Sequence, residues 1–143
     1  MSVTTQRFHK RYLLVTAIVV GSFGPVFSLA TTESGGDLAR WTLDLLNGPG
    51  GDAVNFDADT TRFLSALTGG FLLGWGVMIF GLRAWVYDAA PEGVRKAVVA
   101  GLLAWFVLDS AGSVASGNAW NVAFNVLVLV LAVGPMWRPA VAP

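Results

Sequence analysis

Polar side chains recur inside two apolar stretches in the second half of the chain, and their spacing suggests chemistry. Asp109 is the one acid within an apolar stretch, and the next stretch carries Asn121 and Asn125, four residues apart. Trp105, Asp109 and Ser113 also recur every four residues, so they share one face of a helix. An ionisable side chain in such a setting is costly and is expected to face the protein interior.

The two stretches place these polar residues at matching depths. Counted from the far ends of the stretches, Asp109 lies 13 residues in and Asn125 lies 12 residues in, which corresponds to about 20 Å and about 18 Å of helix. The short polar turn at 116–118 makes the stretches antiparallel neighbours. We therefore predict that Asp109 faces Asn125 and that Ser113 faces Asn121, and we call these four residues the polar seam.

The polar seam has three interpretations. As a structural feature, it would join two helices by hydrogen bonds worth roughly 0.6–2 kcal/mol each. As a binding site, it would form an outward-opening pocket for a small polar ligand, a lipid headgroup or an ion, with Trp105, Asp109, Ser113, Asn121 and Asn125 as candidate ligand-binding residues. As a proton-transfer site, it would need a chain of titratable groups, and Asp109 stands alone in the apolar stretches.

The sequence lacks the residues that enzyme chemistry at membrane depth requires. There is no cysteine, which excludes disulfides, zinc–thiolate sites and thiol catalysis. The single histidine, His9, lies in a basic run outside the apolar stretches, so it offers neither a base for serine proteolysis nor a haem ligand there. Aspartyl proteolysis needs two paired acids. We expect no catalytic residue, no metal site and no cofactor, and therefore no enzyme.

Four apolar stretches, at about 12–30, 63–86, 97–115 and 120–137, must position the seam. Hydrophobic residues make up 55% of the chain and charged residues 13%, against about 45–50% and about 25% in soluble domains. Each stretch is close to the ~20 residues that a helix needs to cross a bilayer. We therefore predict an all-α integral membrane bundle of four transmembrane helices, with a single membrane domain over 1–143.

The first stretch has a second interpretation as a cleaved signal peptide. A basic run precedes a short apolar segment, Gly24-Pro25 would break the helix, and Ser28 and Ala30 offer the small residues of a cleavage site. We favour a retained helix, because the apolar residues continue to Ala30 and are numerous enough to span.

The distribution of charge predicts the orientation. With both termini in the cytoplasm, only Arg40 and Arg62 lie outside, as the positive-inside rule requires. We expect a multi-pass protein of the cell inner (plasma) membrane, and the net charge of zero argues against a nucleic-acid partner. The cations placed inside are Arg7, Lys10, Arg11, Arg83, Arg95, Lys96 and Arg138.

The external loop, 31–62, is predicted to hold one short amphipathic helix at about 37–47. Leu38, Trp41 and Leu45 share its apolar face, so this helix would lie on the outer membrane surface or cap the bundle. The acidic run at 52–59 does not fit an EF-hand calcium loop, which needs a glycine at its sixth position. Counted from Asp57, the sixth position is Arg62, a cation. Asp59 or Thr60 is instead expected to cap the next helix.

Glycines in the second stretch predict close helix packing. Gly70 and Gly74 form a GxxxG motif, which lets helix backbones approach one another. The partner is either another span of this chain, which we favour, or a second copy of the chain.

Several of these features together resemble a group of small bacterial four-helix integral membrane proteins. The resemblance covers about 61–139 and implies the four-helix topology but no activity. It is carried by Arg62, Gly69-Gly70, Gly74-Trp75-Gly76, the segment from Trp105 through Asp109-Ser110 to Ser113, Gly117-Asn118, Asn121, Asn125 and Pro135.

We expect a small non-enzymatic inner-membrane protein that acts as an accessory or interaction subunit. Its partners would be the lipid bilayer and another membrane protein or a second copy. The alternative is a binding protein or transporter for a small molecule, a lipid or an ion, which would use the seam at Asp109 and Asn125.

Overall fold

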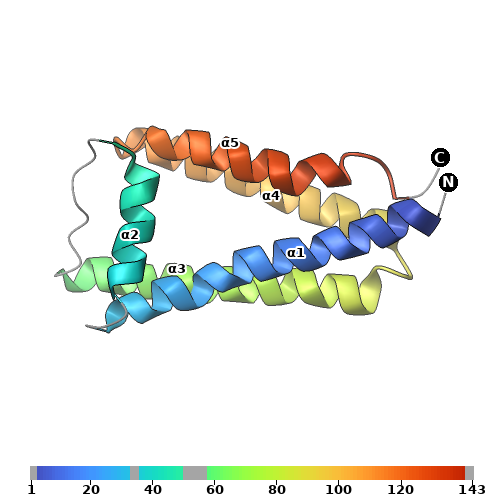
Figure 1. Cartoon of the computed structure of the whole chain (residues 1–143), viewed down its shortest axis with the longest axis horizontal. Helices are drawn as coiled ribbons and strands as arrows, with labels where there is room; N and C mark the ends of the chain where they lie inside the picture. The colour runs from blue at the N-terminus through green and yellow to red at the C-terminus, as the bar shows by residue number, and fades with distance from the viewer. Residues whose placement is uncertain (1–2, 33–35, 50–57, 141–143) are drawn as a thin grey trace.

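The computed structural model describes residues 3–32, 36–49 and 58–140, and every element in these ranges is helical. In Figure 1, α1 lies beside α3, α4 lies beside α5, and α2 crosses from the first pair to the second. Two of the elements, η1 and η3, are 3-10 turns, and η2 is a π-helical turn. The elements are α1 (Val3–Ser28), η1 (Leu29–Thr31), α2 (Gly36–Asn47), α3 (Asp59–Gly81), η2 (Leu82–Val86), α4 (Pro91–Ala115), α5 (Trp120–Val133) and η3 (Gly134–Met136).

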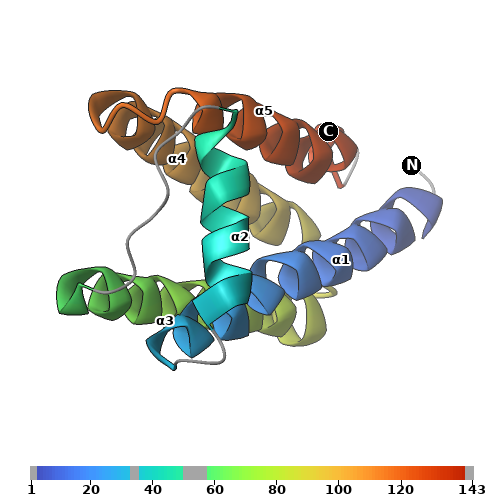
Figure 2. The same cartoon turned by 60° about the vertical axis from the view of Figure 1, so that its left-hand side comes forward.

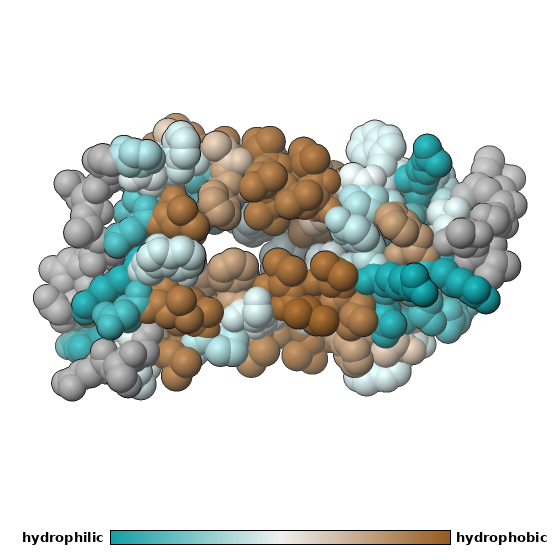
Figure 3. Space-filling model, viewed as in Figure 1, coloured by the Kyte–Doolittle hydropathy of each residue, from teal (hydrophilic) through white to brown (hydrophobic). Residues whose placement is uncertain are grey.

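Three helices are long and apolar enough to cross a membrane, namely Thr5–Thr31, Asp59–Val86 and Pro91–Ala115. The fourth predicted stretch forms the apolar but shorter helix Trp120–Met136, which combines α5 with η3. Hydrophobic residues dominate the middle of the face in Figure 3, and hydrophilic residues gather at the end where the termini lie. An all-helical chain with three such helices is compatible with a membrane protein.

Helices α1 and α3 pack closely because glycine faces glycine. A side chain at Gly76 would begin 2.7 Å from the Cα atom of Gly21, and one at Gly69 would begin 2.5 Å from the carbonyl oxygen of Gly24. Small residues at such a contact let two helix backbones approach. Ser65 adds a hydrogen bond, since its Oγ donates to the carbonyl oxygen of Phe27 at 2.9 Å.

The GxxxG motif of α3 does not make this contact. No described atom outside the local helix lies within 4 Å of the position where a side chain at Gly70 or Gly74 would begin. The expected packing of this motif against another span of the chain is therefore wrong. Gly69 and Gly76 lie on the face of α3 that α1 covers, and the motif lies on another face. A contact of the motif with a second copy stays a prediction.

The bundle has two different ends, which we call the terminal end and the α2 end. At the terminal end, where both termini lie in Figure 1, residues of all four long helices meet in the larger buried cluster. At the α2 end, a smaller cluster joins α2 to α1, η1 and α3. The larger cluster includes Leu13, Ile79, Leu102 and Val133, and the smaller one Phe27, Ala30 and Ala39.

Helix α2 confirms the predicted amphipathic helix and starts one residue earlier, at Gly36. It ends where Gly48 adopts a φ of 74°, a backbone conformation that favours glycine. The ring of Trp120 lies against Gly48, in the space that any side chain there would need. This contact holds the C-terminal end of α2 against the start of α5.

Three large apolar residues of α2 lie on its surface. Leu38, Trp41 and Leu45 are exposed, whereas Ala39 and Thr42 are buried. The helix thus packs through Ala39, Thr42 and the partly buried Leu43, and it leaves those three large side chains exposed. A position on the outer membrane surface stays a prediction for this helix.

Two expectations about helix ends are corrected. Helix α1 continues through Pro25 to Ser28, so Gly24-Pro25 does not break it. Apolar helices tolerate an internal proline where neighbouring groups and local adjustments satisfy the freed carbonyl.

At the start of α3, Ala58 is the N-cap and makes no side-chain capping bond. Asp59 lies in the first turn, where its charge suits the helix dipole and where it pairs with Arg62. It does not cap the helix as expected, because the helix begins one residue too early for that role. Residues 50–57, which hold most of the acidic run, lie outside the described residues.

Candidate functional site

The polar seam forms between α4 and α5. Asn125 Nδ2 donates to Asp109 Oδ2 at 2.7 Å, and Asn121 Nδ2 donates to Ser113 Oγ at 2.9 Å. Both predicted pairs are therefore confirmed. Asn121 Nδ2 also donates to Asp109 Oδ2 at 3.0 Å, so the two amides converge on one carboxylate oxygen.

Ser110 is a neighbour of the seam that the sequence reasoning missed. Its Oγ accepts a hydrogen bond from Asn125 Nδ2 at 3.2 Å. The four-residue spacing that selected Asp109 and Ser113 passes over this position. The sequence signal that could have identified it is a small polar residue directly after Asp109, at nearly the same height along the helix.

Residues on one face of α4 form a stripe whose surroundings differ from one end of the helix to the other. Near the terminal end the stripe lies in the larger buried cluster, between the two helix pairs. At Trp105 it still touches α3, because the rings of Trp75 and Trp105 have centroids 6.4 Å apart. Further on it carries the acid of the seam. In chain order the stripe is Val94, Val98, Leu102, Trp105, Asp109 and Ser113.

Beyond Leu102 this stripe borders an open hollow of about 460 Å³. In Figure 2, the α4–α5 pair and α3 lie close together near the loop that joins α3 to α4 and diverge toward the α2 end. An opening between the two pairs is also visible in the space-filling view of Figure 3. The residues that line the hollow belong to α4 and its C-cap and are Trp105, Leu108, Asp109, Gly112, Ser113 and Ser116.

The five predicted site residues are therefore divided between two roles. Hydrogen bonds join four of them, namely Asp109, Ser113, Asn121 and Asn125. Trp105 instead contacts the ring of Trp75 in α3 and lines the hollow. Asp109 and Ser113 belong to both the seam and the hollow. A ligand-binding role of these residues stays a prediction.

Asp109 has no cation beside it among the described residues. Both of its described hydrogen bonds end on Oδ2, and none reaches Oδ1 within the described part of the chain. Asp88 and Glu92, at the terminal end, instead pair with Lys10 and Arg95. A carboxylate at membrane depth is costly unless protein groups cover it.

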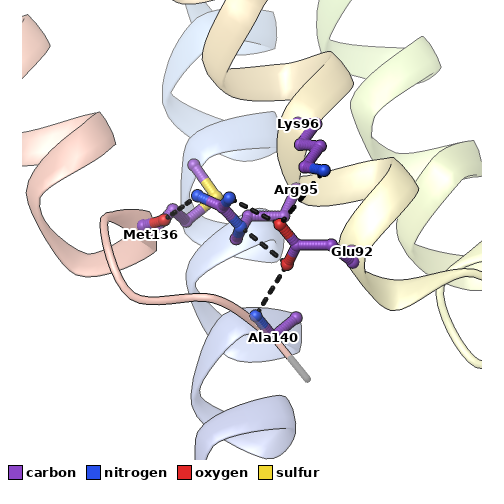
Figure 4. A network of polar contacts seen from close by, with 5 residues as sticks. All are labelled: Glu92, Arg95, Lys96, Met136 and Ala140. Carbon is purple, nitrogen blue, oxygen red and sulfur yellow. Dashed lines mark hydrogen bonds and ion pairs between the residues drawn. The ribbon is translucent and has the colours of Figure 1, made fainter. Parts of the chain in front are cut away.

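A second polar network, which the sequence reasoning missed, lies at the terminal end (Figure 4). Arg95 donates to the two carboxylate oxygens of Glu92 at 2.6 and 2.9 Å and to the carbonyl oxygen of Met136 at 2.8 Å. Glu92 also accepts a hydrogen bond from the backbone N–H of Ala140 at 2.8 Å. We call these four residues the terminal junction. It fastens the segment after α5 onto the first turns of α4.

Two buried polar side chains near the junction lack hydrogen-bond partners among the described residues. His9 and Tyr87 are each 1% exposed, and neither the ring nitrogens nor the hydroxyl is hydrogen-bonded. The backbone of Pro135 lies next to the His9 ring without a hydrogen bond of normal geometry. Burial raises the pKa of Tyr87 to about 12, so its hydroxyl keeps its proton to a higher pH than that of a free tyrosine.

No family model matches the chain, and no curated protein and no solved structure has significant similarity to it.

Proposed function

We propose that this chain is a small, non-enzymatic accessory subunit of a larger assembly in the cell inner (plasma) membrane. The observation that carries the proposal is the stripe of α4, which is covered near Val94 and Leu102 and open around Asp109. Polar groups at membrane depth are covered by protein or line a water-filled space. A helix of another membrane protein, lying along the hollow, would supply this cover.

The placement of the cations supports the orientation that we propose. Lys10, Arg83 and Arg95 lie together at the terminal end, where the Arg83 Nε atom donates to the carbonyl oxygen of Lys10 at 2.9 Å. Cations near membrane-spanning helices favour the cytoplasmic side. We therefore place both termini in the cytoplasm, with α5 and η3 as the fourth crossing.

A second candidate is a binding protein or transporter for a small molecule, a lipid or an ion. The volume of the hollow, about 460 Å³, favours it, since ligand pockets measure about 300–1,000 Å³. Such pockets enclose most of the ligand surface, whereas the lining here comes from one helix. The openness of the hollow is why we rank the accessory subunit first.

Site-specific photo-crosslinking distinguishes these two candidates. Leu108 lines the hollow and is 78% exposed, whereas Val107 is 65% exposed and lies on the far side of α4 from Asp109. With p-benzoylphenylalanine at position 108 of the full-length chain in its own membranes, we expect a crosslink to a second polypeptide. The same group at position 107 is the matched control and should react with lipid alone.

Each other outcome has a definite meaning. Absence of a polypeptide crosslink from position 108, or equal crosslinks from both positions, would contradict the accessory role. A small-molecule adduct that forms at position 108 alone would favour the second candidate.

A further inference from the structure

We infer that the partner contributes a lysine or arginine side chain, carried on a membrane helix, that pairs with Asp109 in the hollow. The inference rests on the proposed function, because it names the chemistry by which the partner subunit would be recognised. Three features of the site support it: the charge of the carboxylate, the aromatic ring beside it, and the shape of the lining.

The first feature is an unbalanced charge. Asn121 and Asn125 both donate to Oδ2 of Asp109, and no described group donates to Oδ1. No Lys or Arg of the described chain pairs with this carboxylate, whereas the acids of the terminal end have such partners. An acid at membrane depth characteristically pairs with an opposite charge from a neighbouring helix. A cationic N–H donor would fill the free oxygen with a charge-assisted hydrogen bond.

The second feature is the ring of Trp105. It lies one helical turn from Asp109 and lines the same hollow. A cation over the face of an indole is attracted by the ring, and most strongly where water is excluded. A carboxylate and an indole on adjacent turns thus favour a cation over a neutral or anionic group.

The third feature is the shape of the lining, which fits a helix better than a compact ligand. The lining extends from Trp105 to Ser116 along one helix, a length of about 16 Å. It includes two small residues, Gly112 and Ser113. No described atom outside the local helix lies within 4 Å of the position that a Cβ atom at Gly112 would take. Small residues in such a strip let a second helix come close.

Depth argues against a lipid headgroup as the occupant. Asp109 lies six residues before the end of α4 at Ala115, which is about 9 Å along the helix. A lipid amine would have to leave the headgroup layer to reach it, whereas a lysine or arginine on a neighbouring helix can extend to it along its aliphatic stem.

The variant Asp109→Asn isolates the charge. Its amide oxygen can still accept the hydrogen bonds from Asn121 and Asn125, so the seam is retained while the negative charge is lost. Gly112→Leu does the reverse, because it keeps the charge and blocks close approach. Ala111→Leu, one residue earlier and outside the lining, is the matched control for added bulk.

The test is the yield of the polypeptide crosslink from position 108 in full-length chains carrying these variants, in their own membranes. We expect Asp109→Asn and Gly112→Leu each to lower the yield about tenfold, and Ala111→Leu to leave it unchanged. The crosslinked peptide should map to a membrane helix that contains a lysine or arginine. Asp109→Lys should abolish the crosslink, and replacing that basic residue by aspartate should restore it.

The failures of the two proposals are distinguishable. An unchanged yield in Asp109→Asn, or a mapped helix without a basic residue, would overturn the inference and leave the accessory role intact. Absence of any polypeptide crosslink would overturn both. A further outcome is an amine lipid that is bound to the wild-type chain and absent from Asp109→Asn. This result would overturn the inference of a partner helix and would favour the second candidate. The charge exchange gives an answer even if Asp109→Asn alone fails to fold.

Discussion

The terminal junction and the polar seam are both polar networks between helices of the same bundle, but only the junction is closed. Arg95 joins Glu92 to the carbonyl of Met136, which lies 41 residues after Arg95 in the chain. The seam joins residues at most 16 apart, and its carboxylate has no described cation partner. The junction therefore fastens the segment after α5 to the start of α4, whereas the seam joins the facing ends of one hairpin and leaves a carboxylate available to another molecule.

The largest expected effect is the loss of the junction. Arg95→Ala removes the hydrogen-bonded cation of the Glu92 carboxylate, which is 23% exposed, and releases the carbonyl of Met136. The carboxylate then keeps only Lys96, whose Nζ lies 4.0 Å away. We expect the free energy of unfolding to fall by about 3 kcal/mol, because breaking a partly buried ion pair is costly. Thermal and denaturant unfolding in detergent would measure this change.

The matched control for that variant is Arg62→Ala. Arg62 also pairs with an acid three residues away, but its side chain and that of Asp59 are 42% and 94% exposed. An exposed pair contributes about 0–1 kcal/mol. Equal losses from the two variants would show that the terminal junction is no more than a surface pair.

A smaller effect is expected at the seam. Asp109→Leu removes the acceptor shared by Asn121 and Asn125, and we expect a loss of about 2 kcal/mol, since each amide loses one hydrogen bond and keeps only the one to a serine hydroxyl. Asp109→Asn should cost less than about 1 kcal/mol, because an oxygen acceptor remains. The same unfolding assay compares the two. A Leu variant as stable as the wild type would show that the seam contributes nothing to the fold.

The smallest effect is expected at the unpaired hydroxyl next to the junction. Tyr87→Phe removes a buried hydroxyl without a described partner, so we expect the free energy of unfolding to stay equal or to rise by up to about 1 kcal/mol. Because burial raises the pKa of Tyr87 from 10.0 to about 12, the folded chain holds this proton more tightly than the unfolded chain. Wild-type stability should therefore fall as the pH rises from 10.0 toward about 12.

Unfolding measured against pH tests this second point. The Phe variant should lose the part of the alkaline destabilisation that comes from residue 87. A large loss of stability in the Phe variant at neutral pH would mean that the hydroxyl has a partner and that the junction extends to it.

The seam could be predicted from sequence because it depends on local quantities. Helix rise and a short turn are enough to place Asp109 opposite Asn125, whatever the rest of the bundle does. The close packing of α1 and α3 could not be assigned in the same way. Helix α3 has glycines on two faces, and only the partner helix decides that Gly69 and Gly76, rather than Gly70 and Gly74, form the contact.

The terminal junction and the hollow depend on distant parts of the chain. Glu92 and Arg95 look like an ordinary surface pair until the segment after α5 returns to them. The divergence of the two helix pairs toward the α2 end likewise has no residue pattern within α4 that reports it. The position of Asp109 opposite Asn125 was therefore predictable, whereas the divergence of the helix pairs beside it was not.

Native mass spectrometry of the full-length chain, released gently from its own membranes, tests most directly whether the stripe of α4 around Asp109 is covered by a partner. We expect the chain to leave the membrane bound to a second polypeptide in a fixed ratio, and Asp109→Asn to release that polypeptide. A chain that leaves the membrane alone, with or without a small adduct, would contradict the accessory role.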